Sequence, residues 1–292
     1  MFRLSLLLSG SLGFTALMHL LNSRHKIAAV FTDHKSVAIL LFCQQNAIPY
    51  YLGNPRNGKA ETFIKEITCD ILLSINYLFI IEKDLIQWPN LFAINLHGSL
   101  LPKYRGRTPH IWAIINGELE TGVTAHLIEP GVDRGAILKQ VIIPISNNDT
   151  GSDILNKFSH YYPQIIDDIL TDIADNKIIL EAQDEMKATY FGKRTPEDGH
   201  INWSWSKERI RNWVRAQARP YPGAFTFLDD FKLIVHKTSY NDLGFHYEQP
   251  NGIILACDSM KIFVKTPNGV LALLEFEFEG AVKSIEKGKI LT

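Results

Sequence analysis

The sequence predicts an α/β protein built on a mostly parallel sheet, followed by a smaller β-rich domain. Two observations support this prediction. In the first half of the chain, short apolar segments alternate with helical segments, a pattern typical of parallel sheets covered by helices on both faces. In the last third, several short apolar segments follow one another, which favours an OB-like barrel or an open sheet. We therefore expect a Rossmann-like larger domain and a small β domain.

The elements are predicted in order from apolar runs and from turn and capping residues. Strands of the larger domain are expected at residues 3–8, 27–32, 69–75, 91–96, 121–128 and 135–145. Helices are expected at residues 14–23, 37–46, 153–174 and 207–218. Gly10 and Gly13 turn the first strand into the first helix. The β-rich part is predicted to contain strands at residues 225–227, 232–237, 253–256, 261–265 and 270–277.

The length of 292 residues is typical of one large domain plus a small one. The stretch 192–203 is rich in turn residues, and Pro196 and Gly199 favour a boundary there. We expect a larger domain over residues 1–195, and a linker helix with the β-rich domain over residues 196–292.

Charge and cysteine content argue against several classes of protein. The formal net charge is -1, from 30 basic and 31 acidic residues, so composition gives no support to nucleic-acid binding. The three cysteines are odd in number and lack CxxC spacing, which indicates reduced thiols and a cytoplasmic protein. Glycines interrupt the N-terminal apolar run, so a strand, turn and helix explain it better than a secretory signal. No apolar run is long enough to predict a membrane span.

Asn95 and His97 stand at the end of a predicted buried strand. Because side chains alternate along a strand, both residues lie on the same face. An amide can stabilise an oxyanion, and an imidazole can exchange a proton near neutral pH. The pair therefore predicts a site where a nucleophile attacks a carbonyl; the alternative is a turn cap beside an ordinary histidine.

Asp133 lies in the short connection between two predicted strands that follow this site. If these strands pack beside the strand of Asn95, the carboxylate approaches His97, sets its tautomer and raises its basicity. Taken alone, an aspartate in such a connection is more often a simple turn residue.

A basic loop, containing Lys103, Arg105 and Arg107, follows the Asn-His pair. The functional interpretation is a site for phosphate or carboxylate, and arginine suits bidentate contact. The alternative is a solvated basic loop.

These motifs together resemble the formyltransferases that use N10-formyltetrahydrofolate. The resemblance rests on the Asn-x-His of Asn95 and His97, the segment 99–106 (SLLPKYRG) and the Asp-x-Gly of Asp133 and Gly135. The stretches RTPEDGHINW and RPYPGAF look like the family's entry into its second domain. The resemblance covers most of residues 1–228, and the last strands match only loosely.

The resemblance implies roles for individual residues. It implies that Asn95 stabilises the oxyanion, that His97 assists proton transfer and that Asp133 orients His97. The formyl-folate co-substrate is expected at Tyr77, Leu78, Ile80, Leu100, Pro102, Glu129 and Val132, although Tyr77 and Leu78 are equally suited to the core. The second substrate is expected at Ser9, Gly10, Lys103, Arg105 and Tyr221. No metal is implied, and the histidines show neither HxxxH nor HExxH spacing.

Within this family the resemblance favours the sugar N-formyltransferases. Methionyl-tRNA formyltransferases usually carry a basic insertion after the second strand, whereas residues 30–41 pass directly from strand to helix. The expected acceptor is a nucleotide-linked aminosugar, a dTDP-3- or 4-amino-dideoxyhexose before a UDP sugar, used for surface polysaccharide such as O-antigen. A homodimer without nucleic-acid or membrane partners is expected. A formyl-folate hydrolase would share Asn, His and Asp, and is the other alternative.

Overall fold

The computed structural model describes residues 1–258, 260–280 and 285–292. The chain divides into two compact units, each made of several segments. The first contains residues Met1–Gly106, Thr121–Ile143 and Lys157–Phe191, and the second contains Arg107–Glu120, Pro144–Asn156 and Gly192–Thr292. The chain enters the second unit for the last time at Gly192, close to the predicted boundary between residues 195 and 196. A single boundary there remains a prediction, because two earlier segments also cluster with the second unit.

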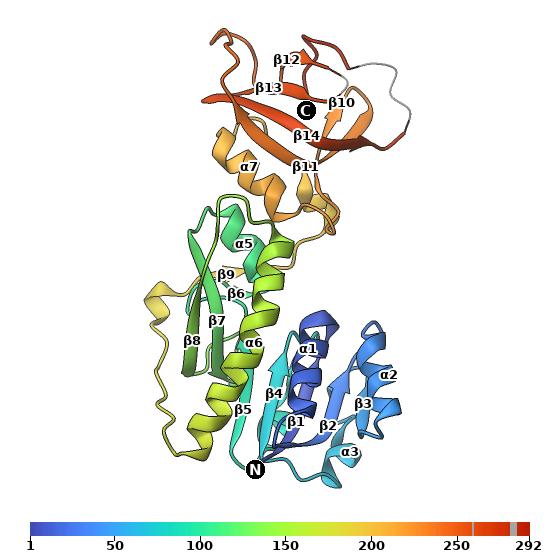
Figure 1. The fold of residues 1–292 in the computed structure, drawn as a ribbon, viewed down its shortest axis with the longest axis vertical. Coiled ribbons are helices and arrows are strands. Elements are labelled where there is room, and N and C mark those ends of the chain that lie inside the picture. The colour runs from blue at the N-terminus through green and yellow to red at the C-terminus, as the bar shows by residue number, and fades with distance from the viewer. Residues whose placement is uncertain (259, 281–284) are drawn as a thin grey trace. The chain divides into compact units, whose positions relative to one another are not determined.

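The first unit is built around a seven-stranded sheet (Figure 1), with strands β1 (Arg3–Leu8), β2 (Lys26–Thr32), β3 (Tyr50–Leu52), β4 (Ile71–Ile75), β5 (Phe92–His97), β7 (Glu120–Leu127) and β8 (Ile137–Pro144). Their order is β3-β2-β1-β4-β5-β7-β8. The strands from β3 to β5 pair in parallel, and β7 pairs antiparallel with β5. The predicted mostly parallel α/β sheet is confirmed.

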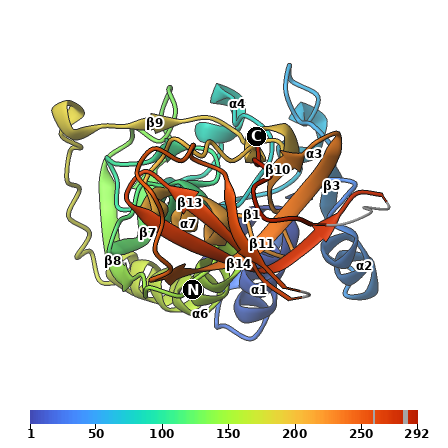
Figure 2. The ribbon, with the colours of Figure 1, turned by 90° about the horizontal axis from the view of Figure 1, so that it is seen from above.

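Helices cover both faces of this sheet. They are α1 (Gly10–Leu21), α2 (Val37–Gln45), α3 (Glu61–Lys65), α4 (Lys83–Ile86) and α6 (Gly151–Ala174). Helices α1, α2 and α6 lie on one side of the sheet, and α3 and α4 lie on the other (Figure 2). On the α3 and α4 side, the apolar core includes Leu7, Phe31, Leu72 and Leu85, all at most 1% exposed. Because both faces of β1 and β4 are covered, these strands are mostly apolar and, apart from Arg3, buried along their whole length.

The second unit contains a five-stranded antiparallel sheet, with strands β10 (Ala224–Leu228), β11 (Phe231–Asn241), β12 (Ile254–Cys257), β13 (Ile262–Thr266) and β14 (Gly269–Phe278). Their order is β10-β11-β14-β13-β12. Leu291 bridges to Leu228 at one edge, and Ile290 bridges to Ile253 beside the other. Because one short segment pairs at both edges, the sheet must curl toward closure, which protects its edges. Helices α5 (Pro109–Ile115) and α7 (Lys207–Ala216) belong to this unit.

Three strands of the structure were not predicted. They are β3 and a two-stranded parallel pair, β6 (Arg105–Gly106) and β9 (Tyr190–Phe191). Each is only two or three residues long, so neither the period of two nor an apolar run can develop in the sequence. The β6–β9 pair matters for the site, because β6 lies in the loop that follows β5.

Gly135 makes the turn after Asp133 possible. A Cβ at this position would lie 1.9 Å from the carbonyl oxygen of Leu127, a backbone atom that cannot move cheaply. We expect Gly135→Ala to lower the free energy of unfolding by at least about 1–3 kcal/mol, as overpacking does. Gly192→Ala is the matched control, because its Cβ would meet no atom within 4 Å. Urea unfolding of both variants checks this, and equal midpoints would contradict it.

Candidate active site

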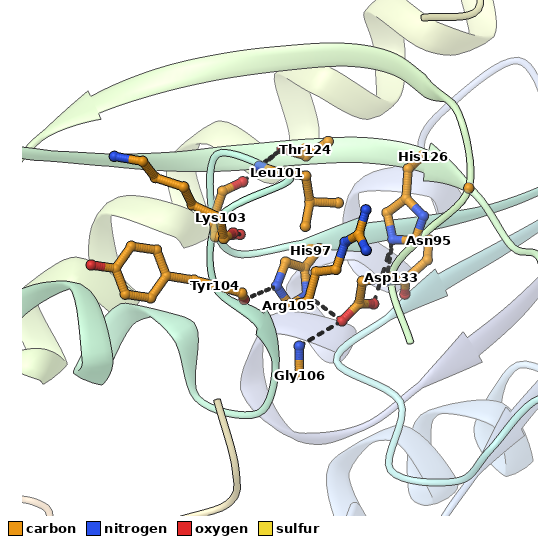
Figure 3. A network of polar contacts seen from close by, with 12 residues as sticks. Asn95, His97, Leu101, Lys103, Tyr104, Arg105, Gly106, Thr124, His126 and Asp133 are labelled. Atoms are coloured by element: carbon orange, nitrogen blue, oxygen red, sulfur yellow. Dashed lines mark hydrogen bonds and ion pairs between the residues drawn. The ribbon is translucent and has the colours of Figure 1, made fainter. Parts of the chain in front are cut away.

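The site forms where β5 and β7 lie side by side in antiparallel register. Asn95 on β5 is directly opposite His126 on β7, and His97 is opposite Thr124. Directly opposite residues of such a pair share a face of the sheet. Nδ2 of Asn95 accordingly lies 3.1 Å from Nε2 of His126. Figure 3 shows both imidazoles on either side of Asp133.

His97 is held by a backbone carbonyl in the loop after β5. Its Nε2 lies 2.8 Å from the carbonyl oxygen of Tyr104, so Nε2 carries a hydrogen and donates it. In the neutral ring the lone pair is therefore on Nδ1, which lies 3.6 Å from Oδ2 of Asp133. A proton taken up at Nδ1 would face this carboxylate. The Tyr104 carbonyl sets the tautomer, and Asp133 stabilises the protonated ring.

Asp133 is placed by a strained turn. Its φ is 51°, in the left-handed region that residues other than glycine rarely adopt. Its Oδ2 accepts a hydrogen bond of 2.8 Å from the backbone N–H of Gly106, and its Oδ1 lies 3.6 Å from Nε2 of His126. The turn thus puts one carboxylate between two imidazoles.

His126 was missed in the sequence, and its Nε2 lies close to both the Asn95 amide and the Asp133 carboxylate. It is 3% exposed, and its Nδ1 donates to the carbonyl oxygen of Leu127 at 2.8 Å. Nε2 then accepts a hydrogen bond from the Asn95 amide. This bond fixes the orientation of the amide and uses one of its two N–H groups. A histidine in the mostly apolar run TGVTAHLI was the signal in the sequence, but only its pairing with Asn95 on β5 shows that it belongs to the site.

Burial and neighbouring charges have opposing effects on the pKa of His97 and on that of Asp133. Burial lowers the pKa of His97 below its ordinary value, and the Asp133 carboxylate and Tyr104 carbonyl only partly offset this. His126 adds a smaller lowering effect on the pKa of His97. Burial acts to raise the pKa of Asp133, but His97, His126 and the Gly106 N–H outweigh it and keep that pKa below its ordinary range. The pair is therefore an ionised carboxylate beside a neutral imidazole near neutral pH, which suits a general base.

The structure argues against the predicted role of Arg105 in substrate binding. Its side chain is 0% exposed and its guanidinium is already paired within the protein. It forms an ion pair with Glu185 at 2.9 Å, donates to Gln183 at 2.8 Å and donates to the Tyr190 hydroxyl at 2.5 Å. Because its counterion comes from a segment far away in the sequence, the basic loop alone suggested a free cation.

The structure also argues against the predicted contact of the second substrate with Ser9 and Gly10. Ser9 is 1% exposed, and the N–H of Gly10 donates to Oγ of Ser36 at 2.9 Å. The Ser36 hydroxyl in turn donates to the Asp33 carboxylate at 2.7 Å. Burial acts to raise the pKa of Asp33, but the hydrogen bonds from Ser36, Ser9 and the nearby backbone together keep that pKa below its ordinary value. A negative charge already stands beside this helix start, which disfavours a phosphate there.

The other predicted contacts remain predictions. Lys103 is exposed on the loop after β5. Tyr221 lies in the second unit, where its hydroxyl is 3.0 Å from Nε2 of His110. Among the expected folate contacts, three apolar side chains in loops of the first unit are strongly exposed: Leu78 at 41%, Ile80 at 63% and Val132 at 55%. Glu129 is also exposed, whereas Tyr77, Leu100 and Pro102 are half-buried.

Throughout the described part of the chain, no group of three or more His, Cys, Asp or Glu has the arrangement of a metal site. Among the helices described, none combines the length and the apolar character needed to cross a membrane.

Comparison with known proteins gives the family. Residues 6–170 match the model of the formyl transferase family, and residues 193–286 match that of the formyl transferase C-terminal domain. A curated relative, the bifunctional polymyxin resistance protein ArnA of Wigglesworthia glossinidia brevipalpis, is 36% identical over 264 residues. The alignment covers 87% of this chain but only 40% of that protein, so the chain spans about two fifths of the relative's length.

Solved structures share the fold. An N-formyltransferase from Helicobacter canadensis, in complex with folinic acid and dTDP-3-aminofucose, has a TM-score of 0.71 at 20% identity and covers 95% of this chain and 100% of its own. The sugar 3N-formyltransferase WlaRD has a TM-score of 0.67 at 20% identity, covering 94% and 98% of the two chains. A methionyl-tRNA formyltransferase from Clostridium thermocellum has a TM-score of 0.56 at 20% identity, covering 82% and 94%.

The fold and the paired family models agree with the motifs around Asn95, His97 and Asp133. The first model alone spans more than half of the chain and contains all three residues. The chain therefore belongs to the formyl transferase family.

Proposed function

We propose that this enzyme transfers a formyl group from N10-formyltetrahydrofolate to the amine of a nucleotide-linked aminosugar. The convergence of the Asn95 amide, the His97 imidazole and the Asp133 carboxylate carries the proposal (Figure 3). An oxyanion donor, a base and a group that stabilises the protonated base are what attack of an amine on a formyl carbon requires.

The co-substrate supplies an activated formyl carbon, and the residues of this chain supply the proton and charge management. As the amine attacks, negative charge develops on the formyl oxygen, and in this proposal the N–H of Asn95 that does not face His126 donates to that oxygen. His97 takes the proton that the amine nitrogen loses, at Nδ1, where Asp133 stabilises the resulting cation. His97 then returns that proton to the folate nitrogen as the bond to the formyl carbon breaks, so the base is regenerated.

The exposed apolar side chains support folate as the partner. Leu78, Ile80 and Val132 belong to loops of the same unit as the catalytic residues. Flat, partly apolar ring systems bind to surfaces of this kind, with a few polar groups that fix their orientation. Folinic acid and 5-N-formyl-tetrahydrofolate in the related structures support the same choice.

The choice of an aminosugar acceptor rests on the relatives. Two structural neighbours act on sugars or contain a dTDP-aminosugar, and both match nearly the whole chain. We propose a dTDP-3- or 4-amino-dideoxyhexose as the acceptor, in a cytoplasmic homodimer that serves surface polysaccharide synthesis such as that of O-antigen. Neither nucleic acid nor a membrane is part of this proposal.

The test is a panel of acceptors with N10-formyltetrahydrofolate, read by mass spectrometry of the formylated product. We expect formylation of at least one dTDP-aminosugar and none of methionyl-tRNA. Formylation of methionyl-tRNA but of no aminosugar would favour the tRNA enzyme. Release of formate at full rate without any amine would favour the hydrolase. The same panel with the parent dTDP-sugars that lack the amine is the control, and it should give no product.

A further inference from the structure

Residues 183–191, called here the strap, run along the loop that follows β5. Two residues of the strap form β9, which pairs in parallel with β6: Tyr190 is paired with Arg105, and Phe191 with Gly106. The Tyr104 and Phe191 rings also stack, with their centroids 4.9 Å apart. The strap is thus attached to the loop that supplies the Tyr104 carbonyl to His97 and the Gly106 N–H to Asp133.

Gln183 connects this strap to the turn that carries Asp133. Its Nε2 donates two hydrogen bonds of 2.8 Å, one to the carbonyl oxygen of Asp133 and one to that of Gly135. Its Oε1 accepts from Nε and Nη2 of Arg105, at 3.1 and 2.8 Å. All donors and acceptors of this side-chain amide are therefore used.

The orientation of the Gln183 amide is determined by its neighbours. Arg105 is a cation that can only donate, so the amide oxygen must face it. The two backbone carbonyls can only accept, so the NH2 group must face them. Glu185 and Tyr190 hold the guanidinium from its other side. The buried Arg105 thus acts as a fixed support for Gln183.

Thr189 holds the backbone of the loop that follows β5. Its Oγ1 accepts from the N–H of Tyr104 at 2.8 Å, and its carbonyl oxygen accepts from the N–H of Arg105 at 2.8 Å. The carbonyl group of the same residue, Tyr104, accepts the hydrogen bond from Nε2 of His97. A shift of Thr189 would therefore move the group that fixes the His97 ring.

Backbone strain points to the same two places. Tyr104 has a φ of 61° and Asp133 a φ of 51°, both in the left-handed region. Residues other than glycine stay in that region only where their surroundings hold them, and such residues cluster at functional sites. The strap bonds directly to the backbone of both residues, through Thr189 and Gln183.

We propose that the strap is a positioning element of the active site, in which Gln183 and Thr189 hold the strained backbone at Asp133 and Tyr104 and so set the contact between His97 and Asp133. This inference rests on the proposed function for the roles of His97 and Asp133. Gln183 and Thr189 touch no reacting atom and act only through those two residues.

The main test is Gln183→Met, which keeps the length of the side chain and removes both donors and the oxygen that accepts from Arg105. We expect kcat to fall about 10- to 100-fold, since small misplacements of catalytic groups have effects of this size. KM for both substrates should stay within about twofold of wild type, because the strap contacts neither substrate in this proposal. Thr189→Val, at an exposed position, should keep the fold and lower kcat in the same direction.

An NMR titration of the His97 ring, without either substrate, separates positioning from simple stability. The groups that face this ring are Asp133, His126 and the Tyr104 carbonyl, and Asp133 is the charged group that raises its pKa. If Asp133 moves away, the midpoint of the titration must shift to lower pH. We expect this shift in Gln183→Met.

Met186→Ala is the matched control, because Met186 lies within the strap and is 94% exposed. It should leave kcat, the titration and the melting temperature unchanged. Folded Gln183→Met and Thr189→Val proteins with wild-type kcat and titration would overturn the proposal. The proposal would also be overturned if kcat fell only in proportion to a lower melting temperature while the midpoint of the His97 titration stayed at its wild-type pH. Because the titration needs no substrate, it tests the strap even if the proposed acceptor fails.

Discussion

His97→Ala is expected to lower kcat by about 10²–10⁴, the usual effect of losing a general base. The substitution removes the ring that Tyr104 orients and Asp133 faces, so no other group of the site can accept the proton of the amine at that position. His126 cannot replace it, because its Nε2 already accepts from the Asn95 amide. KM should change little, since the lost interaction acts mainly in the transition state.

Steady-state kinetics with the best aminosugar of the acceptor panel measure this effect. His246→Ala is the control, because His246 is an exposed histidine of the second unit and should leave kcat unchanged. Circular dichroism and the melting temperature should show that His97→Ala is folded. A folded His97→Ala enzyme with turnover close to wild type would refute the assignment of His97 as the base.

Asp133→Asn should lower kcat and also shift its pH dependence. The neutral His97 ring is the active base, so kcat rises as the pH increases through the pKa of His97. The Asp133 carboxylate raises that pKa, whereas burial and His126 lower it. Removing the charge therefore lowers the pKa of His97 further, and the rising limb must move to lower pH. The base becomes weaker at the same time, so we expect kcat on the plateau to fall by about 10- to 1000-fold.

A pH profile of kcat for wild type and Asp133→Asn checks both expectations. Asn keeps the size of the side chain and an oxygen that can accept from the Gly106 N–H, so the turn should be preserved. Asp242→Asn, an exposed aspartate of the second unit, is the control and should reproduce the wild-type profile. A limb that moves to higher pH would show that Asp133 does not act on His97 through its charge.

Most of the regular structure could be predicted from the sequence. The buried strands β1, β4 and β5 are apolar runs bounded by turns, and α6 begins and ends close to the predicted residues 153 and 174. The short strands β3, β6 and β9 could not be predicted in this way, because their existence depends on a neighbouring strand and their residues show no period.

The candidate site was predictable in part. Asn95 and His97 could be paired because two residues on one strand share a face whatever the rest of the fold does. The environment of Arg105 could not be predicted in this way, because its partner Glu185 is 80 residues away in the sequence and meets it only in the folded protein. The charge of a loop is visible in the sequence, whereas its neutralisation is not.

The sequence by itself determined the fold class, the family resemblance, and Asn95, His97 and Asp133 as the candidate catalytic residues, because these depend on residue type, local spacing and alternation. Only the tertiary structure decided that His126 holds the Asn95 amide, that the Tyr104 carbonyl sets the His97 tautomer and that the strap supports both. These contacts join segments that are distant in the chain. Their geometry depends on strand register and on left-handed backbone at Tyr104 and Asp133, which tertiary packing must hold in place.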